Sequence, residues 1–338
     1  MTWTAERTSA NQRVQIGPES TTALGTSVAA GKLLECFDFT FGIQADVNFY
    51  TPTGRKYANV QEENTEWTDI AITGNLDYNG VIYLLAGIMG SSSVAAHLAS
   101  ATAKDWVYTP PLSTPSVVPQ TYTIQQGDAI RAHQAAYGLV TEFAYKGTRK
   151  DFSCSAKMIA QPITDGITLT ASPTAVALSP VVAKQVNVYL DTTSAGLGAT
   201  QLTRALSVDY TMTNTYGPLW VLNRTTTGWA AHVDLVPKAT VKLKVEADAN
   251  GMAMLGYLQT GTTYWLRVDA LGTTAIAGDG PGNIFAEFKH DMAVKFGKPS
   301  TFSDDQGVYA IEWELTVVED PTWAKAQTIT VTNLLAAL

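Results

Sequence analysis

Polar and hydrophobic residues alternate along most of this chain. In residues 33–42, Phe37, Phe39 and Phe41 face one side of an extended strand, while Asp38 and Thr40 face the other. The same period of two predicts further strands at about 67–73, 133–146, 151–161, 185–192, 204–213, 217–223, 241–245, 264–268, 284–296, 308–318 and 325–333. The pattern is typical of a mainly β protein.

Two short apolar segments break this alternation. Residues 81–89 and 252–258 each follow an Asn-Gly pair, and the first segment stops at Gly90. Asn-Gly can begin a helix, and Gly commonly ends one. We therefore expect one short helix, packed on the sheet, in each half of the chain.

The second half of the chain repeats the pattern of the first. At a shift of 171 residues, 33–41 matches 204–212 and 77–80 matches 248–251. At a shift of 172 residues, 136–143 matches 308–315. Three matches in one order, at nearly one offset, predict two tandem copies of a whole domain, since the repeats of solenoid proteins are much shorter.

These matches divide the chain into four parts. We expect a polar N-terminal arm at 1–32, a first copy at 33–165, a linker at 166–184 and a second copy at 185–338. In the first copy, 43–65 holds strand-like pieces around a turn, which predicts a long projecting β-hairpin. The loop at 224–239 takes the corresponding place in the second copy.

Composition narrows the function. The chain has 338 residues, of which 46% are hydrophobic and 15% charged, with a net charge of −8 and a pI of about 5.0. A surface poor in charge suits association with further copies. Static binding of nucleic acid is disfavoured, because it needs clustered Lys and Arg. The N-terminus lacks a signal-peptide core, and no apolar run approaches the roughly 18 residues of a spanning helix. We expect intracellular synthesis and no membrane insertion.

No spacing of residues indicates a catalytic, cofactor or metal site. The two cysteines, Cys36 and Cys154, form no CxxC pair. We expect them to be buried thiols, and the sequence leaves a disulfide between them open. A nucleophile elbow is missing as well. The histidines lack HxH or HxxxH spacing; they are His97, His133, His232 and His290. We therefore expect no enzyme, no cofactor and no bound metal.

Four carboxylates recur in the matched segments. Asp38 and Asp209 lie opposite the apolar face of equivalent strands, and Glu142 and Glu314 do the same in the third match. One interpretation is the solvated outer face that antiparallel sheets commonly have. The other is a smooth, acidic surface that lines a channel. The two lysines of the 241–245 strand would make such a lining mixed in charge.

The order of elements resembles the tail tube domain of bacteriophages. The residues that carry the resemblance are 67–74, which lead into the helix at 78–90, and the paired strands at 137–145 and 152–159. It covers nearly the whole chain when both copies are counted. The resemblance implies a small β-sandwich or barrel with one flanking helix and a projecting hairpin in each copy.

The resemblance also implies an assembly. Inner strands of such domains join across subunits into one barrel around a lumen, and duplicated members from long-tailed phages form homotrimers that make pseudo-hexameric rings. The rings would stack through the arm and the long loops. The implied contact residues are Tyr50, Arg55, Lys56, Glu62, Glu63 and Arg224.

The function implied by the resemblance is physical rather than chemical. Such a tube is a structural part of the virion tail, assembled in the host cytoplasm, and conducts double-stranded DNA during ejection. Its partners would be further copies, the tape-measure protein, and the tail terminator and tail tip proteins. A negative lumen would repel phosphates. Its implied lining is Asp38, Asp209, Glu142 and Glu314.

Three other functions fit parts of the sequence. A contractile-tail or secretion-system tube would share the fold, but such tubes usually consist of single-domain hexamers. A surface adhesin or carbohydrate-binding β-sandwich could use tryptophan platforms, for which the candidates are Trp220, Trp229, Trp265 and Trp313. A hydrolase would need a nucleophile or metal signature that the sequence lacks.

Overall fold

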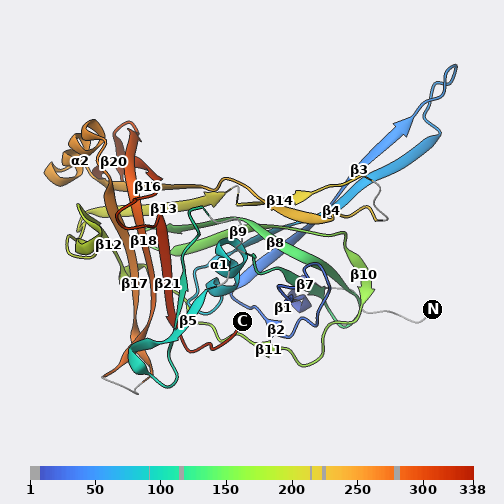
Figure 1. Cartoon of the computed structure of the whole chain (residues 1–338), viewed down its shortest axis with the longest axis horizontal. Coiled ribbons are helices and arrows are strands. Elements are labelled where there is room, and N and C mark those ends of the chain that lie inside the picture. Colours follow the sequence, from blue (N-terminus) through green and yellow to red (C-terminus); the bar gives the residue numbers. More distant parts are fainter. Residues whose placement is uncertain (1–7, 91, 114–117, 214, 223–225, 278–281) are drawn as a thin grey trace.

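The computed structural model describes residues 8–90, 92–113, 118–213, 215–222, 226–277 and 282–338. Those residues are mainly β, as the alternation predicts, with two α-helices, α1 (Val81–Met89) and α2 (Ala249–Thr260). Figure 1 shows a long hairpin that projects from one end of the body and a steep sheet, seen edge-on, at the other end.

Seven strands from the first half of the chain form one antiparallel array. They are β1 (Arg13–Pro18), β3 (Phe37–Tyr50), β4 (Val60–Asn75), β7 (Tyr122–Gly127), β8 (Ala132–Gly147), β9 (Phe152–Ala160) and β10 (Thr164–Ile167). Their order is β1-β7-β8-β9-β4-β3. The seventh strand, β10, pairs with the first half of β8. We call this set the first array.

Seven strands from the second half form the second array. They are β12 (Val186–Asp191), β13 (Ala205–Thr213), β16 (Lys238–Glu246), β17 (Tyr264–Ala277), β18 (Ile284–Pro299), β20 (Val308–Val317) and β21 (Gln327–Asn333). Their order is β12-β17-β18-β20-β16-β13. The seventh strand, β21, pairs with the first half of β18.

The two arrays therefore have the same strand order, and each has its helix after the corresponding strand, because α1 follows β4 and α2 follows β16. In this order β18 stands in the place of β8, and β20 in the place of β9. The sequence match of 136–143 with 308–315 is wrong in this respect, since it aligns β8 with β20. A period of two lets strands in different places of a sheet match equally well.

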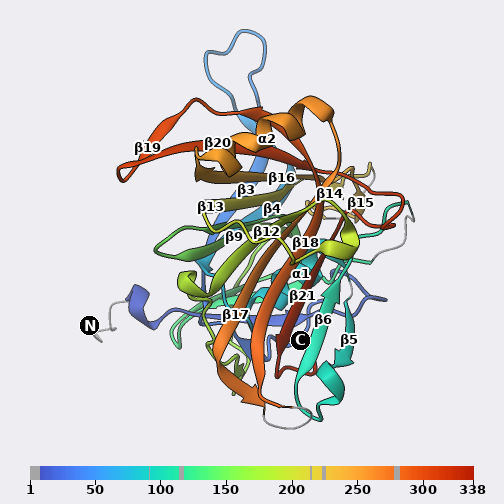
Figure 2. The same cartoon turned by 90° about the vertical axis from the view of Figure 1, so that its left-hand side faces the viewer.

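One edge-to-edge pairing joins the two arrays. Residues 208–212 of β13 pair antiparallel with residues 143–147 of β8, and we call this pairing the array joint. The shorter β5 (Ser93–Ala96) and β6 (Lys104–Tyr108) extend the second array beyond β21. In Figure 2 these strands and the steep sheet face the viewer. The pairings link 19 strands without closing into a barrel among the described residues.

The remaining elements are short. The strands are β2 (Lys32–Leu33), β11 (Thr174–Ala175), β14 (Tyr216–Leu219), β15 (Ala231–Asp234) and β19 (Ser303–Asp305). The 3-10 helices are η1 (Ser9–Asn11), η2 (His97–Ala99), η3 (Ala183–Gln185) and η4 (Ser194–Gly196). Strands β14 and β15 form a separate hairpin.

One hydrophobic cluster joins residues of both arrays. Helix α1 is apolar on all sides and every one of its residues is buried, as expected for a helix inside a core. Gly87 lets α1 pack closely against β8, because a Cβ at this position would lie 2.4 Å from Cγ2 of Val140. By contrast α2 buries only two residues, Gly251 and Met254, and lies at the surface.

Two predicted segments are more integrated than the sequence indicates. Within the predicted arm, β1 pairs along its length with β7, and Ile16 is fully buried. Residues 1–7 of that arm lie outside the described residues. Within the predicted linker, Val176 and Val181 are buried, and the Ser179 carbonyl accepts a hydrogen bond from the Tyr78 amide at 2.9 Å.

Candidate functional site

The array joint makes one continuous sheet from β3, β4, β9, β8, β13, β16 and β20. One face of this sheet packs on the core, and we call the other the open face. In β3, Phe37 and Phe39 are each 5% exposed, whereas Asp38 and Thr40 are exposed. This alternation, a consequence of the period of two, places every second residue on the open face.

All four predicted acids lie on the open face. Asp38 does so in β3, and Asp209 lies between the buried Val208 and Tyr210. Glu314 is exposed between two fully buried residues of β20. Glu142 pairs in register with the exposed Lys157. Because Glu142 and Glu314 belong to strands in different places, these two are not equivalent positions.

Lysines accompany the acids on this face. Lys157 Nζ lies 2.8 Å from Glu142 Oε2, and Lys146 Nζ lies 3.9 Å from Asp209 Oδ2. Lys242 is the register partner of both Asp209 and Glu314. Exposed pairs of this kind contribute only ~0–1 kcal/mol each to stability. Their main effect is on surface charge, so the open face is mixed rather than uniformly acidic.

The first hairpin, residues 43–66, is the outer part of β3 and β4 with the turn between them. Five of the predicted contact residues lie on it and all are exposed: Tyr50, Arg55, Lys56, Glu62 and Glu63. The turn has a left-handed Gly54, with φ of 81°, and closes with a bond from the Asn59 amide to the Tyr50 carbonyl. The sixth predicted residue, Arg224, lies outside the described residues.

The second hairpin, described over residues 215–222 and 226–236, holds β14 and β15 and lies on the first array. The indole of Trp220 meets that of Trp67 edge to face, with ring centroids 5.9 Å apart. The Glu66 amide donates to the Thr227 carbonyl at 3.1 Å. The Trp229 ring stacks on Tyr137 at 4.6 Å. The second hairpin is thus docked, while the first projects from the body (Figure 1).

The array joint pairs the edge of β13 with the end of β8, and the equivalent edges in the other array are those of β3 and of the end of β18. Among the described residues, neither of these two edges has a further strand paired with it. The outer edge of β3 corresponds to the edge of β13, and residues 295–299 of β18 correspond to the end of β8. β3 pairs with β4 alone. Residues 295–299 pair with β20 on one side. At the β3 edge, the Phe39 carbonyl accepts a bond from the Gln126 side chain at 3.1 Å.

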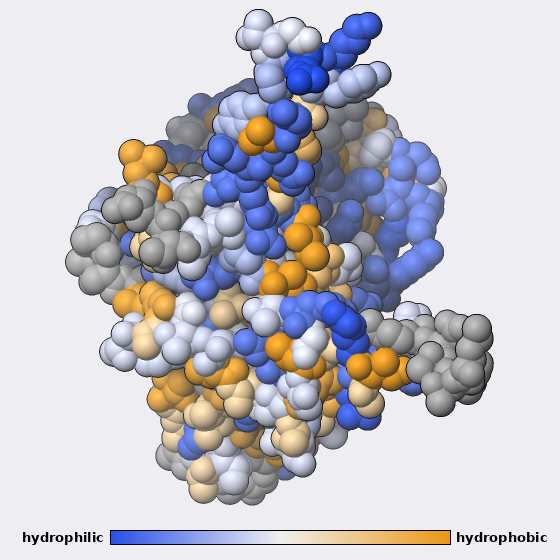
Figure 3. All heavy atoms as spheres, turned by 90° about the vertical axis from the view of Figure 1, so that its right-hand side faces the viewer, coloured by the Kyte–Doolittle hydropathy of each residue, from blue (hydrophilic) through white to orange (hydrophobic). Residues whose placement is uncertain are grey.

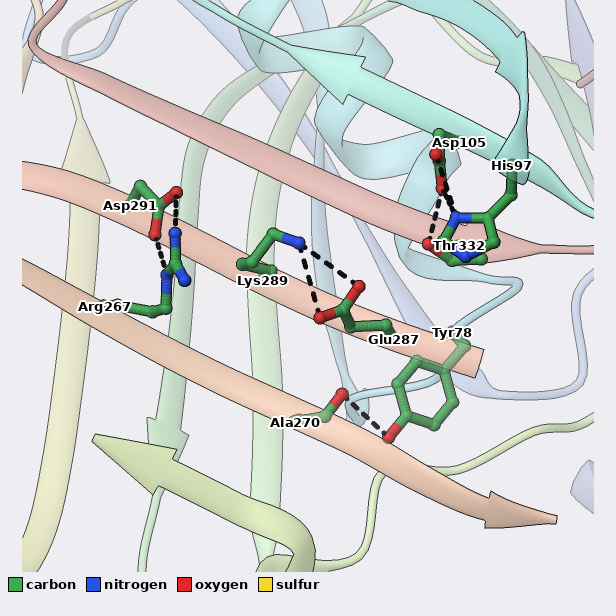
Figure 4. A network of polar contacts seen from close by, with 9 residues as sticks. All are labelled: Tyr78, His97, Asp105, Arg267, Ala270, Glu287, Lys289, Asp291 and Thr332. Atoms are coloured by element: carbon green, nitrogen blue, oxygen red, sulfur yellow. Dashed lines mark hydrogen bonds and ion pairs between the residues drawn. The ribbon is translucent and has the colours of Figure 1, made fainter. Parts of the chain in front are cut away.

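A network of charges on β17 and β18 escapes the sequence analysis (Figure 4). Arg267 binds Asp291 through two bonds, at 2.6 and 3.0 Å, and Lys289 lies 3.3 Å from Glu287. Burial, together with the nearby Glu287 carboxylate, raises the pKa of Asp269 to about 6. The sequence shows acidic and basic residues at alternating positions of these two strands. Which of them form ion pairs depends on the register between β17 and β18, which the sequence alone does not give.

Buried titratable groups in the core are held neutral. Burial lowers the pKa of His290 to about 3, and its Nδ1 lies 2.9 Å from the Tyr145 hydroxyl. Burial also raises the pKa of the Cys36 thiol to about 12. Cys36 and Cys154 are both free thiols, with Cys154 buried and Cys36 partly buried. These groups belong to the packing of the core rather than to a reactive site.

The tryptophans proposed as sugar platforms are mostly inaccessible. Trp229, Trp265 and Trp313 are 2%, 9% and 0% exposed, respectively, and Trp220 packs against Trp67. Sugar platforms need exposed aromatic faces, so these four residues do not form one. Among the described residues, no group of three or more His, Cys, Asp or Glu side chains is placed to hold a metal ion. No helix there is long and apolar enough to cross a membrane.

Comparisons with known proteins give a weak structural likeness and no sequence match. No family model and no curated protein matches the sequence. Among solved structures, the chain is similar to the SPP1 tail tube, in a hybrid structure from solid-state NMR and cryo-electron microscopy. The TM-score is 0.30 and the sequence identity 10%, and the similarity covers 47% of this chain and 81% of that chain. A likeness of this size does not establish a family.

Proposed function

We propose that this chain is the structural subunit of a phage tail tube, built from two copies of one domain that correspond to the two arrays. The observation that carries the proposal is the array joint. It fastens the first array to the second by strand pairing, and the equivalent edges, β3 and the end of β18, have no strand partner among the described residues. Unpaired edges of this kind are templates for pairing with another chain.

The repeated pairings predict how two chains meet. Phe39, Ile72, Ala156 and Phe143 are successive register partners in the first array. Tyr210, Val241, Leu315 and Phe296 are successive partners in the second. Because Met212 pairs with Phe143 in the array joint, Phe41 of one chain should pair with Phe296 of another. This contact is head to tail, so it generates a closed ring or a helix.

Three chains would place six arrays in a ring, the number that the resemblance to duplicated tail tube proteins implies. The open face would line the lumen, and stacked rings would make the conduit for double-stranded DNA and the tape-measure protein. The chain would act in the virion, after assembly in the host cytoplasm, with the tail terminator and tail tip proteins at the ends of the tube. We propose no catalytic step.

Electron microscopy of the purified full-length protein tests the assembly. We expect rings or hollow tubes with threefold symmetry and six similar lobes. A sixfold ring of six chains would instead favour the tube of a contractile tail or a secretion system. Compact particles that bind glycans would favour the adhesin.

A designed disulfide tests the pairing itself. In the proposed contact Gly42 is opposite Lys295, and neighbouring antiparallel strands bring such Cα atoms to about 4.5–5.5 Å, within the range of a disulfide. The double variant Gly42→Cys/Lys295→Cys should form covalent dimers and trimers upon oxidation, seen on non-reducing gels. Neither single variant should do so, because Cys36 and Cys154 are shielded by burial. Cross-linking no greater in the double variant than in the single ones would contradict the contact.

The charge of the open face should control how DNA passes. The test variant replaces four acids by Lys: Asp38, Glu142, Asp209 and Glu314. Each replacement changes the charge by +2, so the net charge rises from −8 to zero. Lys146, Lys157 and Lys242 would then lose the acids that neighbour them on this face, and phosphates would bind. Assembled tubes of the variant should retain about tenfold more double-stranded DNA at low salt than the wild type, with release as salt rises.

Filter retention of labelled DNA measures this effect. The matched control is the Asn/Gln variant at the same four positions, which removes the acids without adding cations and should retain far less DNA than the Lys variant. Equal retention by the Lys variant and the wild type would show that the open face does not meet the DNA.

A further inference from the structure

The two hairpins occupy equivalent positions, and the equivalence extends to single residues. On the outgoing strand Phe39 corresponds to Tyr210, and on the returning strand Ile72 corresponds to Val241. Counting outward from these pairs, Phe49 corresponds to Trp220, and Trp67 corresponds to Val236. Trp220 and Trp67 are the two residues that meet where the second hairpin docks on the first array.

The outer part of the first hairpin carries exposed hydrophobic side chains. Phe49 is 65% exposed and Tyr57 is 82% exposed, and Ile43 and Val60 are exposed as well. Figure 3 shows this hairpin as a largely hydrophilic projection that carries isolated hydrophobic side chains. A narrow two-stranded ribbon that exposes aromatic residues gains stability when it packs on another surface.

A matching surface lies at the base of the second hairpin. Val236, the counterpart of Trp67, is 82% exposed, and the adjacent Leu235 is 40% exposed. Beside them is an apolar groove of about 310 Å³, lined in part by Leu112, Tyr216 and Leu235. The exposed hydrophobic residues Phe49 and Val236 therefore occupy positions equivalent to Trp220 and Trp67, which already meet once within the chain.

We propose that the first hairpin of one chain docks on this base in a second copy, with Phe49 against Val236. The inference rests on the proposed function, because the second copy is the one whose β18 edge pairs with β3. Inside the chain, β13 pairs with β8 at the array joint, and the second hairpin packs on the first array through the contact of Trp220 with Trp67. Between chains, β3 and the first hairpin make the same two contacts.

Cross-linking separates this inference from the proposed function. In full-length protein at assembly concentration, Phe49→Cys/Val236→Cys should yield intermolecular disulfides to an extent similar to Gly42→Cys/Lys295→Cys. If the pair at 42 and 295 cross-links and the pair at 49 and 236 does not, the docking is overturned and the ring contact remains. If neither pair cross-links and the protein stays monomeric, both are overturned.

A double-mutant cycle gives a second measurement. Phe49→Ser and Val236→Ser should each raise the dissociation constant between chains by about tenfold, the effect expected for exposing one apolar side chain. The double variant should have a dissociation constant little higher than that of either single variant, because both substitutions remove the same contact. Leu255→Ser, at an exposed apolar residue of α2, is the matched control and should leave the constant unchanged. Additive losses would overturn the contact.

Discussion

Phe41→Pro is expected to abolish assembly while leaving the folded chain intact. Residues of an antiparallel strand point their amide and carbonyl groups alternately toward and away from a given neighbour. The Phe39 carbonyl points to the outer edge of β3, where it meets Gln126, so the amide of Phe41 also lies on that edge. Proline has no amide hydrogen and its ring occupies that side of the strand, which blocks pairing.

The folded chain should tolerate this proline because β3 is an edge strand. Proline is found in sheets chiefly at edges, where no ladder bond is lost. Phe41 is partly buried and contacts His133, with ring centroids 4.9 Å apart, so losing its ring also has a cost. Phe41→Ala loses the ring and keeps the amide hydrogen, and it is the matched control.

Sedimentation velocity and electron microscopy should separate the two variants. We expect monomers for Phe41→Pro and rings or tubes for Phe41→Ala, with similar circular dichroism spectra for both. Assembly of the proline variant to the same extent as the alanine variant would refute edge pairing through β3.

The strand content and the open face could be predicted from local pattern. Alternation alone places Asp38 and Thr40 opposite Phe37 and Phe39, since a strand has only two faces. The short helices are also visible locally, because Asp248 accepts a bond from the Gly251 amide at 2.8 Å and so caps α2. These features depend on residues close together in sequence.

Strand order could not be predicted in the same way. The sequence places Glu142 and Glu314 at equivalent positions, whereas β8 and β20 occupy different places in their arrays. Lys157 is the partner of Glu142 only because β9 folds back beside β8, and Lys146 reaches Asp209 only across the array joint. A charge on a face can be read locally, but its neighbours depend on pairings between distant residues.

The N-terminal segment shows the same limit more sharply. Its polar composition predicts an arm, but Glu19 is 3% exposed and holds the segment to the body. Glu19 Oε1 accepts bonds from the Tyr137 amide at 2.8 Å and from the Thr123 hydroxyl at 2.9 Å. Its Oε2 accepts bonds from the Gly25 amide at 2.9 Å and from the Thr121 hydroxyl at 2.8 Å. Three of these four donors, on Thr121, Thr123 and Tyr137, lie about 100 residues or more away in sequence and are not predictable from residues 1–32.

Glu19→Ala should therefore be among the most destabilising single changes in the chain. It leaves three buried donors and the half-buried Gly25 amide without their acceptor. Each unsatisfied buried group costs ~1–3 kcal/mol, reduced where a donor can find water. Tyr137 has a φ of 56°, a left-handed conformation that is strained for tyrosine and that the bond its amide donates to Glu19 helps to maintain. We expect the free energy of unfolding to fall by about 3–5 kcal/mol.

Urea unfolding followed by tryptophan fluorescence measures this loss, since Trp229 stacks on Tyr137 and reports on the site. Glu19→Gln keeps one acceptor oxygen and should fall between Glu19→Ala and the wild type. Glu63→Ala, on the exposed first hairpin, should change the free energy of unfolding by less than about 0.5 kcal/mol. If Glu19→Ala were as mild as Glu63→Ala, the four bonds would not hold the segment, and the first array would be stable without it.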